Sequence, residues 1–376
     1  RTLAALQPDV NITLVEPAKT YSACPLSNLV IAGERPLAAQ QFRYQALAAA
    51  GITVAHTTAT DINPATRVVA LATGQRLPYD RLVVAPGIAM RWDALPGYDR
   101  AAAATMPHAW QAGSQTTLLR TQLRDMDDGG LVLISVPDNP YRCPPGPYER
   151  ASLIAHYLQQ HKPRSKLLIL DAKDQFSKQS LFQRAWAQHY GELVEWQGAA
   201  DGARVVSVNA ASGTVNTDFD TFKPTVANII PPQQAGEIAQ RAGLADASGW
   251  CPIRAVDFES TLQPGVHVIG DAAIANAMPK SAFAANAQAR LCAAQISRGL
   301  NDMAPLPTTL LNTCYSLVAP EHGISVAGAY RPAGERWQPV PGAGGTSDPA
   351  ASQRHRNLEA QYAKDWFNVL TEQIWR

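Results

Sequence analysis

Residues 131–171 restrict the possible folds of this chain more than any other part of the sequence does. Residues 131–136, LVLISV, read as a buried strand, and residues from about 147 to 160 read as a helix. A second apolar strand, KLLILD, follows at residues 166–171. A strand, a helix and another strand in this order predict an α/β unit of the kind that binds nucleotides.

The loop between that strand and helix is rich in proline where a nucleotide-binding loop is rich in glycine. It reads YRCPPGPYER and has Pro144, Pro145 and Pro147 after Cys143. Proline lacks the backbone amide that would bind a pyrophosphate, and its ring crowds the space. We therefore expect no NAD(P)H to bind here. The nearby helix start would favour the thiolate of Cys143, although a buried structural cysteine is the alternative.

A second dinucleotide-binding unit is indicated at the beginning of the chain. The residues NITLVE read as a strand that ends at Glu16. An acidic residue at the end of the second strand of a βαβ unit binds ribose hydroxyls. The first strand and its glycine-rich loop lie roughly 20 residues before such an acid. We therefore expect them to be missing from this chain upstream of Arg1.

Two later strands fit the same unit. One covers residues 81–85 and ends in Pro86 and Gly87, and the other, GVHVIGDA, ends at Gly270 and Asp271. Gly270 would let the backbone approach a cofactor, and Asp271 would accept a hydrogen bond from a flavin's ribityl chain. The alternative is that Asp271 caps a helix. These pieces match the plan of the pyridine nucleotide-disulfide reductase class of flavoproteins.

Composition excludes several classes of function. A chain of 376 residues suggests two or three domains, and its 46% hydrophobic and 17% charged residues are typical of a globular protein. The net charge of +1 gives no basis for binding nucleic acid. No apolar run reaches the roughly 18 residues of a transmembrane segment. The cysteines and histidines show no metal-binding spacing, so we expect no metal.

Four longer motifs carry a closer resemblance: YSACPLSN, YRCPPGPYERAS, PKSAFAANAQ and LLNTCYSLVAPEHGISVAG. Over nearly the whole chain the sequence resembles the flavoprotein subunit of flavocytochrome c sulfide dehydrogenase. The resemblance implies an α/β protein with two Rossmann-like domains and a C-terminal α+β domain. The implied ranges are 1–104 and 228–306 for the two parts of the FAD-binding domain, 105–227 for the second Rossmann-like domain, and 307–376 for an interface domain.

The resemblance also implies roles for three of the five cysteines. Cys24 matches the position that holds FAD through a covalent thioether bond. Cys143 and Cys314 match a redox-active disulfide at which hydrogen sulfide is oxidised. Small buried cysteines remain the alternative for all three. Cys251 and Cys292 have no such match, and we expect them to be packing residues.

Two charged residues receive roles from the same resemblance. Glu149 matches a carboxylate near the disulfide, which would take the proton from hydrogen sulfide. An acid in the first turn of a helix also suits the helix dipole alone. Lys280 matches a cation at the pyrimidine end of the flavin, where it would stabilise the anionic reduced form. A solvated surface charge is the alternative for Lys280.

The resemblance predicts a periplasmic sulfide dehydrogenase that passes electrons to a c-type cytochrome. The haem must lie on a separate subunit, because this chain has no CxxCH motif. A sulfide:quinone oxidoreductase is an alternative, since the amphipathic C-terminal segment, NLEAQYAKDWFNVLTEQIWR, suits a membrane surface as well as a protein. A further alternative is a non-catalytic electron-transfer subunit with a structural disulfide.

Overall fold

The α/β unit predicted from residues 131–171 is confirmed as a four-stranded parallel sheet. The computed structural model describes residues 1–376. The sheet has the strand order β12, β11, β10, β16, in which β10 (Leu131–Val136) and β11 (Lys166–Asp171) are neighbours. Helix α5 (Gly146–His161) connects these two strands. The sheet is completed by β12 (Val194–Gln197) and β16 (Val226–Ile229), and α4 (Ser114–Asp125) and α6 (Gln179–His189) belong to the same lobe.

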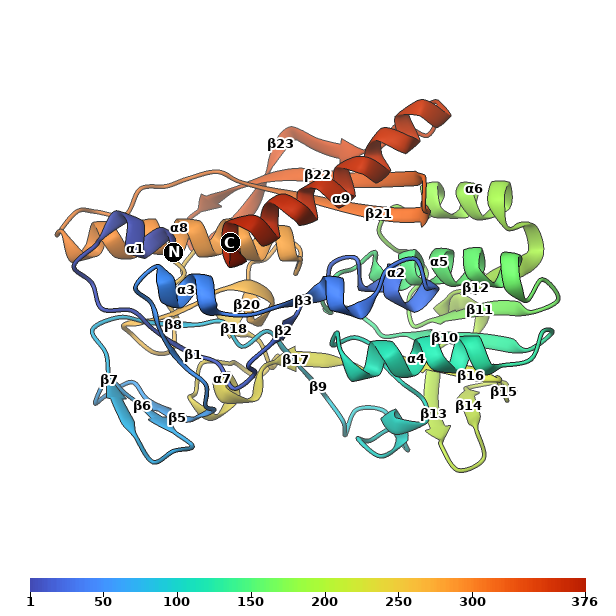
Figure 1. Ribbon diagram of the computed structural model, residues 1–376, viewed down its shortest axis with the longest axis horizontal. Coiled ribbons are helices and arrows are strands. Elements are labelled where there is room, and N and C mark those ends of the chain that lie inside the picture. Colours follow the sequence, from blue (N-terminus) through green and yellow to red (C-terminus); the bar gives the residue numbers. More distant parts are fainter.

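The other lobe contains three separate parallel strand pairs, one of them the short pair of β18 (Cys251–Pro252) and β20 (Ala273–Ile274), and a long helix (Figure 1). Strand β1 (Thr13–Val15) pairs with β4 (Thr53–Ala55), and β19 (Val266–Val268) pairs with β8 (Leu82–Val84). Helix α8 (Ala282–Leu300) begins after Ser281, whose hydroxyl accepts a hydrogen bond from the amide of Ala284. The remaining helices of this lobe are α1 (Thr2–Leu6), α3 (Gln45–Ala49) and α7 (Glu237–Arg241), whereas α2 (Ser27–Ala32) packs against α4 and α5 of the first lobe.

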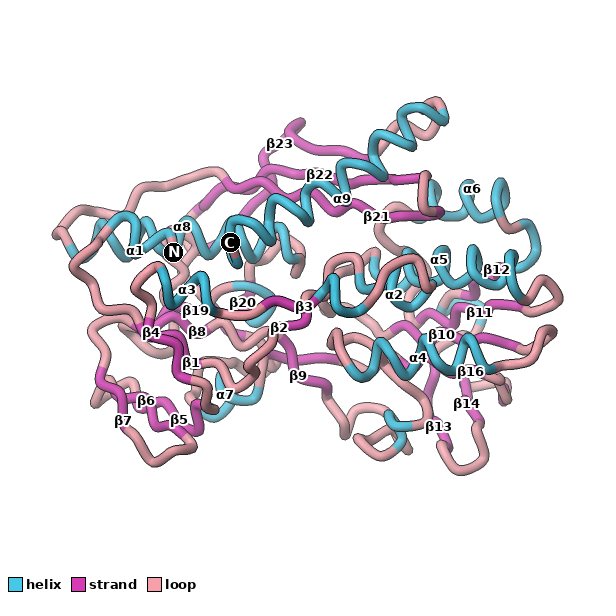
Figure 2. The backbone as a smooth tube through the Cα atoms, viewed as in Figure 1, coloured by secondary structure: helices cyan, strands magenta, loops and turns pink.

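The C-terminal part of the chain forms a layer over both lobes (Figures 1 and 2). Strands β21 (Leu310–Ala319), β22 (His322–Ala333) and β23 (Arg336–Thr346) form an antiparallel sheet. Helix α9 (Gln353–Trp375) packs against it. At Gly323, an added Cβ would lie 2.3 Å from the backbone nitrogen of Ala360. The helix backbone therefore lies directly on the strand.

Short strands and turns complete the chain. They are β2 (Tyr21–Ser22), β3 (Gln41–Phe42), β5 (Ala59–Asn63), β6 (Val68–Leu71), β7 (Arg76–Pro78), β9 (Ile88–Met90), β13 (Val205–Asn209), β14 (Thr214–Thr217), β15 (Thr221–Phe222), β17 (Gln233–Ala235), β18 (Cys251–Pro252) and β20 (Ala273–Ile274), with 3₁₀ turns at Leu37–Gln40, Ala102–Ala104, Gly191–Leu193, Ala199–Asp201 and Gly270–Ala272.

Several sequence predictions are confirmed by these elements. Cys251 and Cys292 are fully buried in the largest hydrophobic cluster, as expected for packing residues. The four predicted domain ranges stay a prediction, and β16 continues the central sheet across the boundary placed at residue 227. None of the helices combines the length and the apolar character that a bilayer crossing needs.

Candidate functional site

The loop before α5 holds Cys143 in one place. Its backbone has a φ of +57°, and its amide donates to the carbonyl of Lys280 at 2.7 Å. The Cys143 carbonyl accepts from the amide of Gly146 at 2.8 Å. A Cβ at Gly146 would lie 3.1 Å from the Cys143 sulfur, so a larger residue would crowd the thiol. The loop therefore fixes the sulfur between α5 and the segment before α8.

Cys314 lies on β21 and is 8% exposed. The side-chain nitrogen of Asn312 donates to its sulfur at 3.3 Å. The ammonium group of Lys178 donates to the Cys314 carbonyl at 2.9 Å and to the hydroxyl of Ser316 at 2.8 Å. All five cysteines of the chain are free thiols in the structure. Cys314 is thus a buried thiol with an amide donor beside it.

The electrostatics of Cys143 differ from the sequence expectation. Burial raises the pKa of this thiol, and the nearby Cys314 thiol and Glu149 carboxylate raise it further. The positive charges of Arg142 and Lys178 act in the opposite direction but are outweighed. The expectation that the helix start favours the thiolate is therefore wrong for this dithiol form, because desolvation dominates. The mutual influence also places the two thiols and Glu149 in one cluster.

Glu149 points into this cluster from the first turn of α5. Its Oε2 accepts from the side-chain nitrogen of Asn28 at 2.8 Å, and its Oε1 accepts from the amide of Leu317 at 2.9 Å. Burial raises the pKa of Glu149, whereas these two donors and the charge of Lys178 lower it. The carboxylate is thus hydrogen-bonded to groups from two other segments, and these bonds exceed what a helix-dipole role needs.

Lys178 was not predicted from the sequence, because nothing in its local pattern distinguishes it from a surface charge. It lies just before α6 in the left-handed region, with φ +63°. Burial lowers the pKa of Lys178 to about 8, while Cys314, Glu149 and Cys143 act to raise it. This cation is therefore shared by both thiols and the carboxylate.

Asp271 lies on the side of the site where the flavin was predicted. Its Oδ1 is buried and has no hydrogen-bond partner, and its Oδ2 lies 3.9 Å from a nitrogen of Arg142. Gly270 has a φ of +73°, a conformation that glycine adopts without strain. Asp271 does not cap α8, because Ser281 does. The unpartnered oxygen is the feature expected of a cofactor ligand.

Arg142 was also missed, although it directly precedes Cys143 in the sequence. Burial disfavours its charge, but Cys24, Asp271, Tyr21 and Cys143 together outweigh burial and raise the pKa of Arg142. This guanidinium therefore stands among the predicted flavin attachment residue, the ribityl ligand and the redox cysteine. Arg142 therefore lies between the predicted flavin-binding residues and the predicted redox cysteine Cys143.

Two further buried groups near Arg142 lack partners. The amide of Arg142 donates to Gln233 Oε1 at 3.0 Å, which leaves Gln233 Nε2 without an acceptor. The guanidinium donates to the carbonyl of Trp110, whose indole nitrogen is also unpaired. Buried polar groups are normally satisfied. Together with Asp271 Oδ1, these groups offer two donors and one acceptor, which fits the polar edges of a flavin.

Lys280 contributes to the turn at Asp271. Its ammonium group donates to the carbonyls of Asp271 and Ala273 at 2.8 and 2.9 Å and lies 3.8 Å from the centre of the Trp250 ring. Burial lowers the pKa of Lys280 to about 8. It is therefore a partly buried cation that holds the turn through two backbone carbonyls, and the alternative of a solvated surface charge is wrong. Its role toward a flavin stays a prediction.

Cys24 and Glu16 lie close to this region. Cys24 is partly exposed between β2 and α2, and Glu16 follows β1, where it accepts from the amide of Ala18 at 2.9 Å. Burial and the charges of Cys24, Asp271 and Glu16 raise the pKa of Tyr21 to about 12. Tyr21 is therefore close to Cys24, Asp271 and Glu16.

Pro86 and Gly87 contact another segment. Gly87 has a φ of +64°, and its carbonyl accepts from the amide of Gly236 at 3.0 Å. A Cβ at Gly236 would lie 2.7 Å from Pro86. The predicted strand end is therefore in close contact with the chain just before α7, and its role toward a cofactor stays a prediction.

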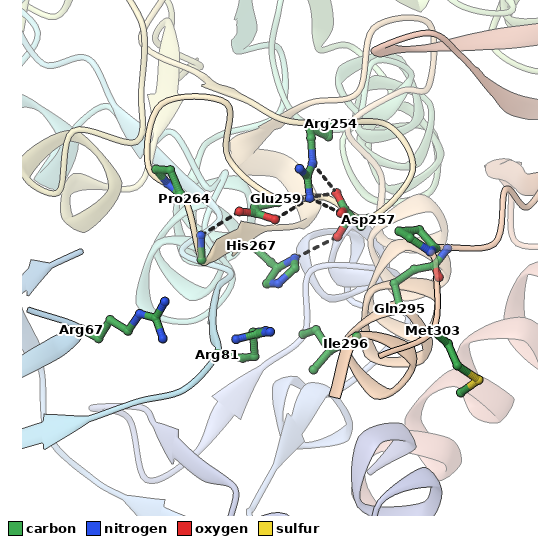
Figure 3. Close-up of a pocket in the computed structure, with 13 residues that line it drawn as sticks. Arg67, Arg81, Arg254, Asp257, Glu259, Pro264, His267, Gln295, Ile296 and Met303 are labelled. Carbon is green, nitrogen blue, oxygen red and sulfur yellow. Dashed lines mark hydrogen bonds and ion pairs between the residues drawn. The ribbon is translucent and has the colours of Figure 1, made fainter. Parts of the chain in front are cut away.

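A pocket of about 390 Å³ lies away from these residues (Figure 3). Arg254, which pairs with Asp257 and Glu259, forms one side, and Arg67 and Arg81 line the pocket opposite it. None of the predicted site residues lines this pocket. It is a separate polar hollow that the sequence did not indicate.

Comparison with protein families identifies two of the domains. Residues 116–231 match the central domain of the sulfide dehydrogenase (flavocytochrome c) flavoprotein chain. Residues 307–375 match the flavin-binding domain of flavocytochrome c sulphide dehydrogenase. The first range includes Cys143 and Glu149, and the second includes Cys314. The resemblance seen in the motifs is therefore confirmed.

Individual relatives extend this result. The mitochondrial sulfide:quinone oxidoreductase of Mus musculus is 22% identical over 282 residues, which cover 69% of this chain and 59% of that protein. That of Dictyostelium discoideum is 22% identical over 278 residues, with the same coverage. The chain thus spans about 59% of the length of these curated relatives.

Solved structures confirm the fold. The sulfide:quinone oxidoreductase of Aquifex aeolicus superposes with a TM-score of 0.73 at 16% identity and covers 97% of this chain and 86% of that chain. A ferredoxin reductase from Rhodopseudomonas palustris gives 0.65 at 16% identity, over 87% and 78% of the two chains. Two domains of the chain are therefore similar to the flavocytochrome c sulfide dehydrogenase flavoprotein chain, and the chain is also similar to sulfide:quinone oxidoreductases.

Proposed function

We propose that this chain is the flavoprotein subunit of a periplasmic flavocytochrome c sulfide dehydrogenase. It oxidises hydrogen sulfide at a Cys143–Cys314 redox pair, reduces FAD bound covalently to Cys24, and passes electrons to a c-type cytochrome subunit. The observation that carries the proposal is the cluster around Lys178, whose ammonium group donates to the Cys314 carbonyl and interacts electrostatically with Cys143, Cys314 and Glu149. The family matches on both sides of this cluster support it.

The proposed reaction begins with the cysteines in the disulfide form. Glu149 accepts the proton of hydrogen sulfide, for which its raised pKa suits it. The hydrosulfide ion attacks one cysteine sulfur, so the bond between the cysteines breaks and a bond to the substrate sulfur forms. The other cysteine leaves as a thiolate with the electron pair of the broken bond. Lys178, whose positive charge interacts with both thiols, stabilises this negative charge.

The residues that would hold the flavin lie next to the redox pair. A thioether to Cys24 would anchor the isoalloxazine ring, and Asp271 Oδ1 would accept from the ribityl chain. FAD, when bound, would supply the acceptor for two electrons, so that the substrate sulfur could leave at the oxidation level of elemental sulfur as the disulfide forms again. Acid precipitation tests the thioether, since flavin released into the supernatant would exclude a covalent bond.

An anaerobic titration tests the reaction itself. Sulfide should bleach the flavin absorbance of the full-length, flavin-loaded protein, whereas NADH should not, because the prolines after Cys143 replace the amides of a nicotinamide dinucleotide site. Cys143→Ser and Cys314→Ser should each abolish bleaching by sulfide and keep the flavin. Cys292→Ala, at a packing cysteine, should behave as wild type. Bleaching by NADH alone would contradict the proposal.

Quinone is the second candidate for the electron acceptor. The curated relatives of this chain are sulfide:quinone oxidoreductases, and α9 has three exposed apolar residues, Leu358, Tyr362 and Val369. An acceptor assay separates the two candidates. Under our proposal, sulfide-reduced protein reduces a c-type cytochrome quickly and a short-chain quinone slowly. The reverse order, or stable flotation with liposomes, would favour the quinone enzyme.

A further inference from the structure

Asn28 connects the helix that follows Cys24 to Glu149. It is the second residue of α2 and is 8% exposed. Its side-chain nitrogen donates to Glu149 Oε2 at 2.8 Å and, at a longer 3.4 Å, to the carbonyl of Gly146. Both of its partners belong to the first turn of α5. Asn28 is thus the contact between the flavin-attachment segment and the carboxylate of the redox cluster.

Arg150 determines which way the amide of Asn28 faces. This arginine is 2% exposed, and its Nε donates to Asn28 Oδ1 at 3.1 Å. A guanidinium group can only donate, so Asn28 must turn its oxygen toward Arg150 and its nitrogen toward Glu149. The other nitrogens of Arg150 donate to the carbonyls of His108 and Ala109 and to Asn228 Oδ1. The orientation of the amide is therefore fixed by a buried cation whose three side-chain nitrogens are all hydrogen-bonded.

This arrangement leaves Glu149 with donors on both oxygens. Asn28 donates to one and the amide of Leu317 to the other, and both bonds favour the ionised carboxylate. The charged and titratable groups that face it are Lys178 before α6, Arg150 on its own helix, and the thiol of Cys143. Burial favours the neutral acid instead. The protonation of Glu149 therefore depends on a balance to which Asn28 contributes.

We propose that Asn28 is a positioning residue, oriented by Arg150, that keeps Glu149 ionised and directed so that it can accept the proton of hydrogen sulfide. The inference rests on the proposed function for the role of Glu149. In Asn28→Asp the side chain keeps its size and its bond to Arg150 but replaces the donor with an acceptor. Two facing carboxylates share one proton, so Glu149 should hold its proton to higher pH.

The test is an infrared pH titration of the full-length protein. The carbonyl band of protonated Glu149 is identified by its loss in Glu149→Gln. In Asn28→Asp this band should persist to a pH higher by about one unit or more. The acidic limb of sulfide-dependent flavin reduction should move by the same amount. Asn28→Ser, which keeps a hydroxyl donor, should show a smaller shift and guards against a folding defect.

Asn216→Asp is the matched control, because it makes the same change in β14, where Asn216 donates to Ser207. It should leave the Glu149 band where it is in wild type. A wild-type titration of the band in Asn28→Asp would overturn the inference. A shifted band in Asn28→Asp, together with a wild-type flavoprotein that sulfide fails to reduce, would uphold the contact between Asn28 and Glu149 and overturn the proposed function, so the two failures are distinguishable.

Discussion

At the scale of single residues, the site is governed by competition between burial and hydrogen bonds. Glu149 and Cys143 are both pushed toward their neutral forms by desolvation. Only Glu149 has donors on its charged atoms, from Asn28 and Leu317. Under the proposed function, proton acceptance would therefore fall to the carboxylate, whereas burial keeps the Cys143 thiol protonated in the dithiol form.

We expect Glu149→Gln to slow sulfide-dependent flavin reduction by about 10²–10⁴-fold, the usual contribution of a general base. In wild type the base must be ionised, so the rate should fall as pH decreases through the raised pKa of Glu149. The variant should lose this acidic limb. Stopped-flow measurements over pH test both points. Glu237→Gln, at an exposed glutamate of α7, should retain the wild-type profile, and an unchanged profile in Glu149→Gln would exclude the base role.

At the scale of elements, the contact between α9 and β22 depends on the absence of a side chain. An added Cβ at Gly323 would lie 2.3 Å from Ala360 N and 2.5 Å from the carbonyl carbon of Glu359. These are backbone atoms of α9, so the clash cannot be relieved by moving one side chain. The helix and strand must instead separate. Because Cys314 lies on the neighbouring strand β21, this packing also supports the redox cluster.

Gly323→Ala should therefore lower the free energy of unfolding by about 1–3 kcal/mol, the usual cost of overpacking. Chemical denaturation of the holoprotein measures this change. Gly299→Ala is the matched control, because this residue of α8 has open space around its Cβ position. The control should be neutral or more stable by at most about 1 kcal/mol. Equal stability of the two variants would contradict the packing argument.

At the scale of the whole molecule, two histidines join the central lobe to the C-terminal sheet. His189 Nε2 at the end of α6 lies 2.8 Å from His322 Nδ1 at the start of β22. Burial, with His189 and Arg356 nearby, lowers the pKa of His322 to about 4. His322 is therefore neutral in the folded protein at neutral pH. The neutral ring of His322 contributes fully to stability at pH values above the pKa that this histidine has in the unfolded chain. The contribution is lost as the pH falls toward the lower pKa that His322 has in the folded protein.

When the pH is lowered from about 7 to about 5, the titration of His322 should decrease the free energy of unfolding by about 1–2 kcal/mol. His322→Asn replaces the ring with a neutral amide, so its stability should depend less on pH in this range. Denaturant unfolding at the two pH values measures the difference. His56→Asn, at an exposed histidine, should keep the wild-type dependence. The same slope in His322→Asn and wild type would exclude His322 as the titrating group.

Local patterns were sufficient for the elements of the central lobe. The bounds predicted for β10 and β11 agree with the structure, and those of α5 differ by one residue at each end. These elements could be predicted because the pattern of apolar residues that indicates a strand or a helix lies within the element itself. The proline loop after β10 could likewise be interpreted from its own residues. The sequence by itself determined the fold class, the change from a glycine-rich to a cysteine-bearing loop, and the segments that carry chemistry.

Only the tertiary structure decided how the site works. Arg142 and Lys178 read as ordinary charges in the sequence, but in the structure Lys178 is buried, Arg142 is largely enclosed, and both act on the thiol of Cys143. The amide of Asn28 is oriented by Arg150, which is far away in the chain. The pKa of Cys143 moves upward because distant segments exclude water from it. Desolvation and charge act through space, so a local pattern carries no information about their strength or their sign.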